Sequence, residues 1–243
     1  MQKEKVTNMK SIDRTWIAPA NKDRFVIFSA AHPVDWASLK VLDYGCNVGR
    51  FLESGGSKIK PCNYLGIDIL SEAIQIARDT FPEYQFIHYD KWHISYNPTG
   101  IANLDPSSAL KVTDKFDVII AYSVFTHYTM EEAIKEIDSL KKLLTPNGCI
   151  LLSLWDAADF KYRAASLSLE FDDSKSVNNA IYLLDEKDIY IDVIPERITD
   201  IETLFSYYNV EQFLTQVENS KVVLTRKDKI ETTNFQTIVK VGT

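Results

Sequence analysis

Residues 40–52 read KVLDYGCNVGRFL and place a glycine-bearing turn between two short apolar runs. The first run has the composition of a buried strand, and the second begins a helix. Such a strand–turn–helix commonly holds a nucleotide-like ligand against its backbone N–H groups. The dinucleotide fingerprint G-x-G-x-x-G does not fit, because it requires glycines where Asn47 and Arg50 stand. A phosphate-binding P-loop does not fit either, since no Gly-Lys-Ser/Thr follows.

The pattern that remains is D-x-G-x-x-x-G, with Asp43 at the end of the strand and glycines at 45 and 49. An acid at this point disfavours a phosphate and favours a ligand that carries an ammonium group or hydroxyls. We expect Asn47 to adopt a positive φ, because asparagine enters the left-handed region at a lower cost than most non-glycine residues.

Strand-like and helix-like segments alternate around this turn. We predict strands at 41–44, 64–68, 84–89, 116–122 and 149–155, and helices at 22–31, 71–81 and 130–144, with Ser71 as an N-cap. A last helix at 209–217 precedes two strands, 221–225 and 235–241, that we expect to form a hairpin. The alternation favours an α/β fold with a doubly wound, mostly parallel sheet and helices on both faces.

Two more acids stand at predicted strand ends. Asp68 ends the second strand, 19 residues after Gly49, where a carboxylate can accept both hydroxyls of a ribose. Asp90 ends the third strand, where it can accept a hydrogen bond from an exocyclic amine such as that of adenine. A single acid of this kind is often a surface or capping residue. Three of them after a glycine turn form a more specific pattern.

This pattern resembles the class I S-adenosylmethionine (SAM)-dependent methyltransferases, in a small-molecule, bacterial type. VLDYGCNVGRFL (41–52) resembles their first motif, with Asn47 where a glycine is usual, and YLGIDILSEAI (64–74) resembles their second. FDVIIAYSVFTHY (116–128) resembles the fourth strand, and LKKLLTPNGCILLSL (140–154) the helix–turn–strand that follows. The resemblance implies a Rossmann-like, seven-stranded sheet with one antiparallel strand, and SAM as the cofactor, released as S-adenosylhomocysteine (SAH).

The resemblance also implies roles for individual residues. Asp43, Gly45, Asn47 and Gly49 hold the methionine end, and Asp68 holds the ribose. The remaining predicted cofactor contacts are Ile69 and Leu70 beside the adenine, Asp90 and Lys91 on it, and Cys46 and Ser123. The resemblance spans about residues 40–155. We expect one domain over 1–243, made of a tail and cap helix (1–39), a SAM-binding half (40–155), an inserted substrate cover (156–208) and a last helix with a strand pair (209–243). The cover is placed by its position after the fifth predicted strand, and the alternative is a solvated subdomain used for dimer contact.

Methyl transfer to a neutral oxygen or nitrogen releases a proton, so a general base assists it. His127 follows the fourth strand and is the first candidate, with His93 as a weaker one; both also fit ordinary exposed or capping histidines. The leading prediction is O- or N-methylation of a small molecule in a biosynthetic pathway. The alternative is a SAM-binding module without catalysis. An NAD-dependent oxidoreductase is opposed by Asn47 and Arg50.

The net charge and its distribution limit the kinds of partner that the chain is expected to bind. The net charge is −7, which argues against nucleic acid, and the NPTG at 97–100 lacks the second proline and the aromatic of DNA amino-methyltransferases. Residues 156–219 hold 14 acidic and 5 basic residues. This acidity is either a solvated surface or a feature that attracts a cationic acceptor.

The three cysteines form no C-x-x-C pair, which predicts free thiols, and the four histidines have no metal-binding spacing, which predicts no metal site. No apolar run is long enough to span a membrane, and no signal peptide is evident. We therefore expect a cytoplasmic protein, monomeric or homodimeric.

Overall fold

The computed structural model describes residues 24–55, 58–93, 96–110, 115–156, 180–184, 189–193, 204–208, 210–224 and 236–243. For 180–184, 189–193 and 204–207 only the backbone is described. Within these ranges, no helix has both the length and the apolar composition needed to cross a membrane.

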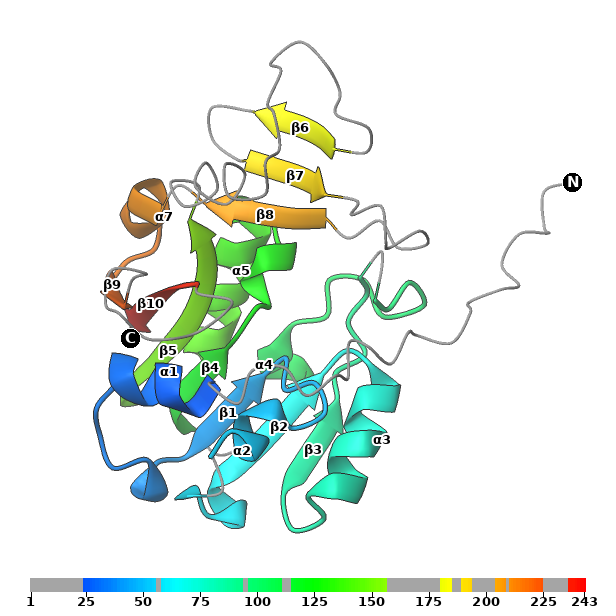
Figure 1. Ribbon diagram of the computed structural model, residues 1–243, viewed down its shortest axis with the longest axis vertical. Coiled ribbons are helices and arrows are strands. Elements are labelled where there is room, and N and C mark those ends of the chain that lie inside the picture. Colours follow the sequence, from blue (N-terminus) through cyan, green and yellow to red (C-terminus); the bar gives the residue numbers. More distant parts are fainter. Residues whose placement is uncertain are drawn as a thin grey trace, which may run out of the picture.

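Seven strands form the sheet that the sequence predicts (Figure 1). The strand order is β3 (Gln85–His88), β2 (Tyr64–Asp68), β1 (Val41–Tyr44), β4 (Phe116–Ala121) and β5 (Leu144–Asp156), all parallel. Strand β10 (Thr237–Gly242) pairs antiparallel with both β5 and β9 (Ser220–Leu224). The predicted doubly wound sheet with one antiparallel strand is therefore confirmed, and so is the terminal hairpin.

Three further strands lie at the carboxyl end of β5. Strands β6 (Ala180–Leu184), β7 (Ile189–Val193) and β8 (Leu204–Tyr208) pair antiparallel with one another in order, and β8 pairs parallel with Trp155 and Asp156. Figure 1 shows them beyond the tip of β5. They belong to the segment predicted as a substrate cover, to which we assigned no secondary structure. Apart from Asp156, the rest of that segment lies outside the described residues, as do residues 1–23 of the predicted tail.

The helices are α1 (Arg24–Ala31), α2 (Arg50–Glu53), α3 (Ser71–Thr80), α4 (Pro106–Ala109), α5 (Met130–Lys141) and α7 (Val210–Gln216), with 3₁₀ turns η2 (Trp36–Ser38), η4 (Pro61–Asn63) and η5 (Phe125–His127). The prediction of Ser71 as an N-cap is wrong: Leu70 occupies that position, and Ser71 is the first helical residue. Asp68 supplies the carboxylate at this end instead, since it accepts the N–H of Leu70.

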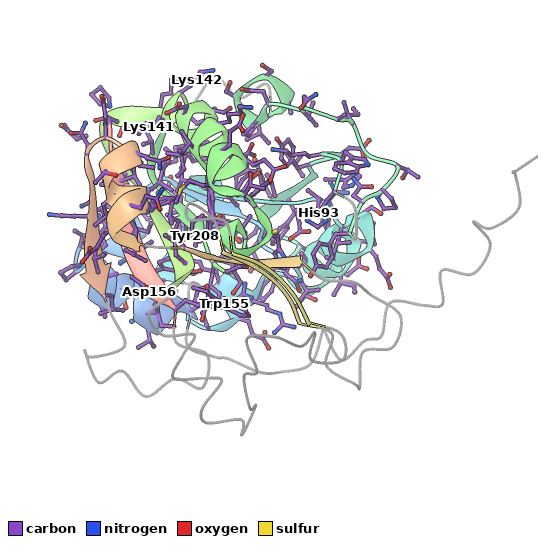
Figure 2. All side chains as sticks on the ribbon, turned by 90° about the horizontal axis from the view of Figure 1, so that it is seen from above. His93, Lys141, Lys142, Trp155, Asp156 and Tyr208 are labelled. Carbon is purple, nitrogen blue, oxygen red and sulfur yellow. The ribbon has the colours of Figure 1, made fainter. Side chains whose placement is uncertain are left out.

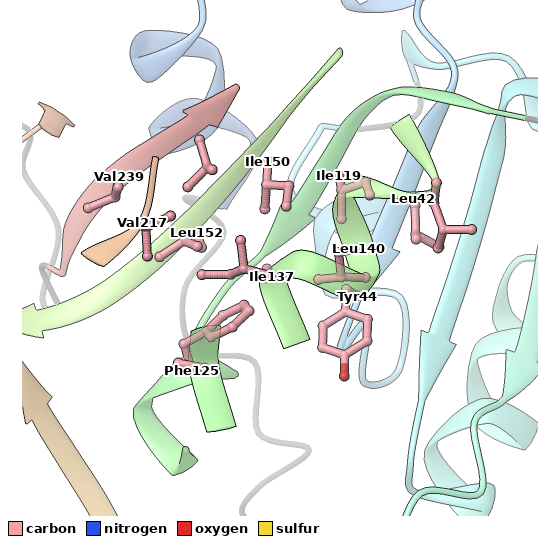
Figure 3. Packing of buried hydrophobic residues seen from close by; sticks show 14 of the residues in the cluster. Leu42, Tyr44, Ile119, Phe125, Ile137, Leu140, Ile150, Leu152, Val217 and Val239 are labelled. Carbon is pink, nitrogen blue, oxygen red and sulfur yellow. The ribbon is translucent and has the colours of Figure 1, made fainter. Parts of the chain in front are cut away.

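Both faces of the sheet are buried, which explains why its strands are nearly continuous apolar runs. Successive residues point to opposite faces, so Leu42 packs with α5 while Val41 packs with α1 and α2. Figure 3 shows Ile137 and Leu140 of α5 against the strands. This packing fixes the strands, and the loops at their carboxyl ends form the candidate site.

Candidate functional site

The glycine turn after β1 contains three residues with a left-handed backbone. The φ angle is +79° at Gly45, +53° at Asn47 and +84° at Gly49. A Cβ atom on Gly45 would lie 2.3 Å from Cγ2 of Val124, so the loop after β4 packs directly on this glycine. The predicted positive φ of Asn47 is confirmed. Asparagine keeps the turn in the shape that a glycine would give it.

Asp68 is oriented by this turn. The backbone N–H of Asn47 donates to Oδ2 of Asp68 at 2.8 Å, and the N–H of Leu70 donates to Oδ1 at 2.9 Å. Burial raises the pKa of Asp68, and these two hydrogen bonds oppose the rise. Each carboxylate oxygen has a second lone pair, so the group remains able to accept hydroxyl donors. Ile69 and Leu70 follow as partly buried side chains.

Asp43 lies deeper, at the end of β1, with 3% of its surface exposed. Its Oδ2 accepts the hydroxyl of Tyr64 at 2.6 Å. Burial raises the pKa of Asp43 to about 6, while the Tyr64 hydrogen bond and the charge of Arg24 lower it. The side chain of Cys46 is fully buried in the core, and its N–H donates to the carbonyl of Ile67 at 2.9 Å.

The NPTG stretch folds the loop after β3 back onto Asp90. Asn97 donates through Nδ2 to Oδ1 of Asp90 and to the carbonyl oxygen of Lys91, both at 3.0 Å. A Cβ atom on Gly100 would lie 2.5 Å from that same Nδ2, so only glycine allows the approach. Asn97 and Gly100 therefore hold Asp90 in place, a role that sequence reasoning did not assign to them.

Lys91, a predicted adenine contact, takes part in a side-chain cluster with α5. Its ammonium group pairs with the carboxylate of Glu136 on α5 and lies 5.2 Å from the ring centroid of Tyr128. Glu136 also accepts the hydroxyl of Tyr44, which lies 3.2 Å from the hydroxyl of Tyr128. Tyr44 and Glu136 are buried, and Lys91 and Tyr128 are partly buried. Glu136 lies on the buried, mostly apolar face of α5. A charged residue on such a face was the sequence signal that could have predicted a buried ion pair.

The two candidate histidines lie together, with Tyr96 between them. The ring centroids of Tyr96 and His127 are 5.1 Å apart, those of His93 and Tyr96 are 4.9 Å apart, and the two imidazoles are 6.0 Å apart. Nδ1 of His93 accepts the N–H of Tyr96 at 3.2 Å, so the neutral ring carries its proton on Nε2. Burial lowers the pKa of His93. His93 is thus suited to donate a hydrogen bond from Nε2.

Ser123 lies two residues after β4 in a strained conformation, with φ of +56°. Its N–H donates to Oγ of Ser153 at 2.7 Å, and its Oγ accepts the amide of Gln236. Ser153 and Gln236 are almost fully buried and hydrogen-bond each other. Ser153 belongs to β5 and Gln236 precedes β10. Their hydrogen bonds fix the conformation of Ser123, and the next residue, Val124, packs against Gly45.

Tyr208 connects the added strands to the histidine turn. Its hydroxyl donates to the carbonyl oxygens of Phe125, at 2.7 Å, and Tyr128, at 2.5 Å, which are the first residue of η5 and the residue after it. Figure 2 shows Tyr208 close to Trp155 and Asp156, where β8 meets β5. Tyr208 is 2% exposed, and it fixes the turn that presents His127.

These groups suit one chemistry. The β1 and β2 loops offer two carboxylates and a close backbone approach to a ligand with ammonium and hydroxyl groups. The loops after β3 and β4 bring two imidazole rings together, and imidazole can accept or donate a proton near neutral pH. Among the side chains that the structure describes, no three His, Cys, Asp or Glu residues form a group that could hold a metal ion.

A family model described as a methyltransferase domain matches residues 42–150, from β1 into β5. Among curated proteins, the chain is similar to the uncharacterized protein RP028 of Rickettsia prowazekii (strain Madrid E). The two are 23% identical over 181 residues, which cover 74% of this chain and 68% of that protein.

Solved structures share the fold. An S-adenosylmethionine-dependent methyltransferase from Clostridium acetobutylicum ATCC 824 has a TM-score of 0.53 at 17% identity and covers 95% of this chain and 96% of its own. SAM-bound CalS10, an amino pentose methyltransferase from Micromonospora echinaspora, has a TM-score of 0.52 at 15% identity. The match covers 91% of this chain and 89% of CalS10.

The matched domain, the strand order with its single antiparallel strand and the glycine turn after β1 agree with one another. Residues 42–150 match a methyltransferase domain, and the chain shares its fold with a solved S-adenosylmethionine-dependent methyltransferase.

Proposed function

We propose that this chain transfers the methyl group of SAM to an oxygen or nitrogen atom of a small-molecule acceptor, with His127 as the general base. The observation that carries the proposal is the contact of His93 and Tyr96, in the loop after β3, with His127 at the end of η5. Val124 packs on Gly45 only three residues before His127, so the imidazole and the glycine turn share one edge.

The chemistry needs little else from the protein. The methyl group of a sulfonium is already activated, so the protein aligns donor and acceptor and keeps water out. On this proposal, Asp43 faces the ammonium group of SAM, Asp68 accepts the ribose hydroxyls and Asp90 accepts the adenine amine. His127 removes the proton that the attacking oxygen or nitrogen loses. His93 donates from Nε2 and orients the acceptor.

The acceptor's chemistry is supported by one neighbour and by one charge pattern. CalS10 acts on an amino pentose, according to its description. The acidity of residues 156–219 would attract an amine or a guanidinium, but its clusters at 172–173 and 185–188 lie outside the described residues. We therefore propose an amino-bearing small molecule as the first acceptor class to test, with hydroxyl acceptors second.

Two measurements test the proposal. Calorimetry should show SAM binding, and Asp68→Ala should weaken it by about 30- to 1,000-fold, because two charge-assisted hydrogen bonds of about 2–4 kcal/mol in total are lost. Asp79→Ala removes an exposed carboxylate of α3 and should bind SAM normally. Incubation with amines, sugars and phenols should then yield SAH. SAM binding that never leads to SAH with any acceptor would favour the non-catalytic alternative.

A further inference from the structure

Arg24, the first residue of α1, has an unusual environment. Its guanidinium carbon lies 5.0 Å from the centroid of the Tyr122 ring, at the end of β4. Its Nε is buried and donates to no acceptor in the described part of the chain. The guanidinium also forms no ion pair with the described residues. A buried guanidinium donor without an acceptor costs free energy, so a partner is expected.

The charge of Arg24 acts on the cofactor loops. It lowers the pKa of Asp43 and of Asp68, and it also lowers the pKa of the Arg50 guanidinium in α2. These groups belong to the ends of β1 and β2 and to the glycine turn between them. The guanidinium therefore lies at the end of the site where the methionine moiety of SAM is expected.

Helix α1 holds this arginine firmly. The N–H of Phe25 donates to Oγ of Ser54 at 2.8 Å, and the rings of Phe25 and Phe51 are 5.5 Å apart. The ring of Phe28 packs edge-on against Tyr122 at 6.1 Å. The helix is thus fixed both to α2, which follows the glycine turn, and to β4.

The methionine moiety carries an ammonium group and a carboxylate. Asp43 and Asp68 suit the ammonium and the ribose, but two buried acids repel a carboxylate, which then requires a cation. Arg50 is already engaged with Oδ1 of Asn47 at 3.4 Å. We propose that Arg24 binds the carboxylate of SAM through Nε and an Nη in a bidentate pair, and so makes the site selective for ligands with a free carboxylate. This inference rests on the proposed SAM site.

The test compares SAM with decarboxylated SAM, which differs only in lacking that carboxylate. By calorimetry the unchanged protein should bind SAM about 10- to 100-fold more tightly than the decarboxylated form. Arg24→Met keeps an apolar stem over Tyr122 and should abolish the preference: SAM binding weakens by about that factor, and binding of decarboxylated SAM changes by less than about threefold. Arg24→Lys should keep part of the preference, because it keeps the charge without the bidentate fork.

Arg78→Met is the matched control. Its guanidinium donates to the carbonyl of Phe86 from Nε at 3.2 Å and from Nη2 at 2.8 Å, so its loss should lower the melting temperature and leave the preference unchanged. If Arg24→Met does not fold, Arg24→Gln takes its place. If Arg24→Met loses affinity for SAM and for decarboxylated SAM equally, Arg24 has a structural role and the inference is overturned. A variant that keeps the preference for SAM over decarboxylated SAM would overturn it too. If the unchanged protein binds neither ligand, the proposed SAM site itself is wrong.

Discussion

The two sides of the sheet's carboxyl edge are built by different means. After β1 and β2, the backbone shapes the site: Gly45, Asn47 and Gly49 have positive φ, and two backbone N–H groups orient Asp68. After β3 and β4, the rings of His93, Tyr96 and His127 contact one another. A backbone turn tolerates few residue types, whereas ring contacts can change without altering the fold. On the proposed function, the first side recognises the cofactor and the second selects the acceptor.

The substitution His127→Ala should have the largest effect, and it tests whether the loops after β3 and β4 affect turnover without affecting SAM binding. Loss of a general base should lower turnover by about 10²- to 10⁴-fold and leave SAM affinity nearly unchanged. Turnover is measured as SAH released, and affinity by calorimetry. His32→Ala, which removes an imidazole at the end of α1, serves as the control. Unchanged turnover with a hydroxyl acceptor would return His127 to a structural role.

The opposite side should respond to the backbone of Asn47. Asn47→Val should weaken SAM binding by about 5- to 30-fold, since a β-branched residue at φ of +53° costs about 1–2 kcal/mol or more. Asn47→Gly should bind SAM as the parent does, although it loses the Oδ1 contacts with Val48 and Arg50. Both variants need only a titration by calorimetry. Equal affinity of Asn47→Val would mean that the turn is not constrained.

Lowering the pH should also weaken the cofactor side. The pKa of Asp43 is raised to about 6, so SAM affinity should fall about tenfold between pH 7 and pH 5 as the carboxylate is protonated and no longer attracts the ammonium group. Stability moves the other way. The unfolded chain loses this proton at a lower pH than the folded chain, so the Asp43 contribution to stability falls as pH rises toward 6.

Asp43→Asn tests both halves of this prediction, because it cannot ionise. Its SAM affinity should be low and nearly independent of pH, and its melting temperature should gain relative to the parent as the pH rises from 4 to about 7. A parent protein whose SAM affinity is flat between pH 5 and pH 7 would contradict the assignment of Asp43.

The smallest effect is expected at the junction of β8 with the histidine turn. Tyr208→Phe removes the hydroxyl that binds the carbonyls of Phe125 and Tyr128. The loss of about 1 kcal/mol should reduce turnover by about fivefold through a looser η5, with SAM affinity unchanged. Steady-state kinetics and calorimetry on one preparation give both values. A fall in SAM affinity equal to the fall in turnover would show that the two sides are not separate.

Local chemistry made much of the fold predictable. Strands β1 and β2 have the predicted bounds, because each is an apolar run closed by an acid and a turn. The positive φ of Asn47 followed from the tolerance of asparagine for that region. Strands β6 to β8 were missed, although their residues suit strands. Whether an inserted segment pairs with the sheet depends on a partner far away in the sequence, here Trp155 and Asp156.

The site was less predictable, because sequence places a residue at a strand end but does not give the direction of its side chain. Lys91 follows Asp90 in the sequence, and its ammonium group forms an ion pair with Glu136 of α5, which sequence position does not reveal. Asn97 was assigned no role from the sequence, and in the structure it binds Asp90. Arg24 carried no motif at all, and only three-dimensional packing brings it against Tyr122, at the end of β4.

The position of β10 has a consequence for synthesis of the chain. Thr237–Gly242 pairs with Cys149–Leu154, roughly eighty to ninety residues earlier, and Ile238, Val239 and Val241 become fully buried. At about 5–20 residues per second, a ribosome produces β5 about 4–20 seconds before β10. During that interval one edge of β5 has no strand beside it, and such an edge invites pairing with other chains. Translation speed over the last third of the message should therefore govern how much nascent protein aggregates.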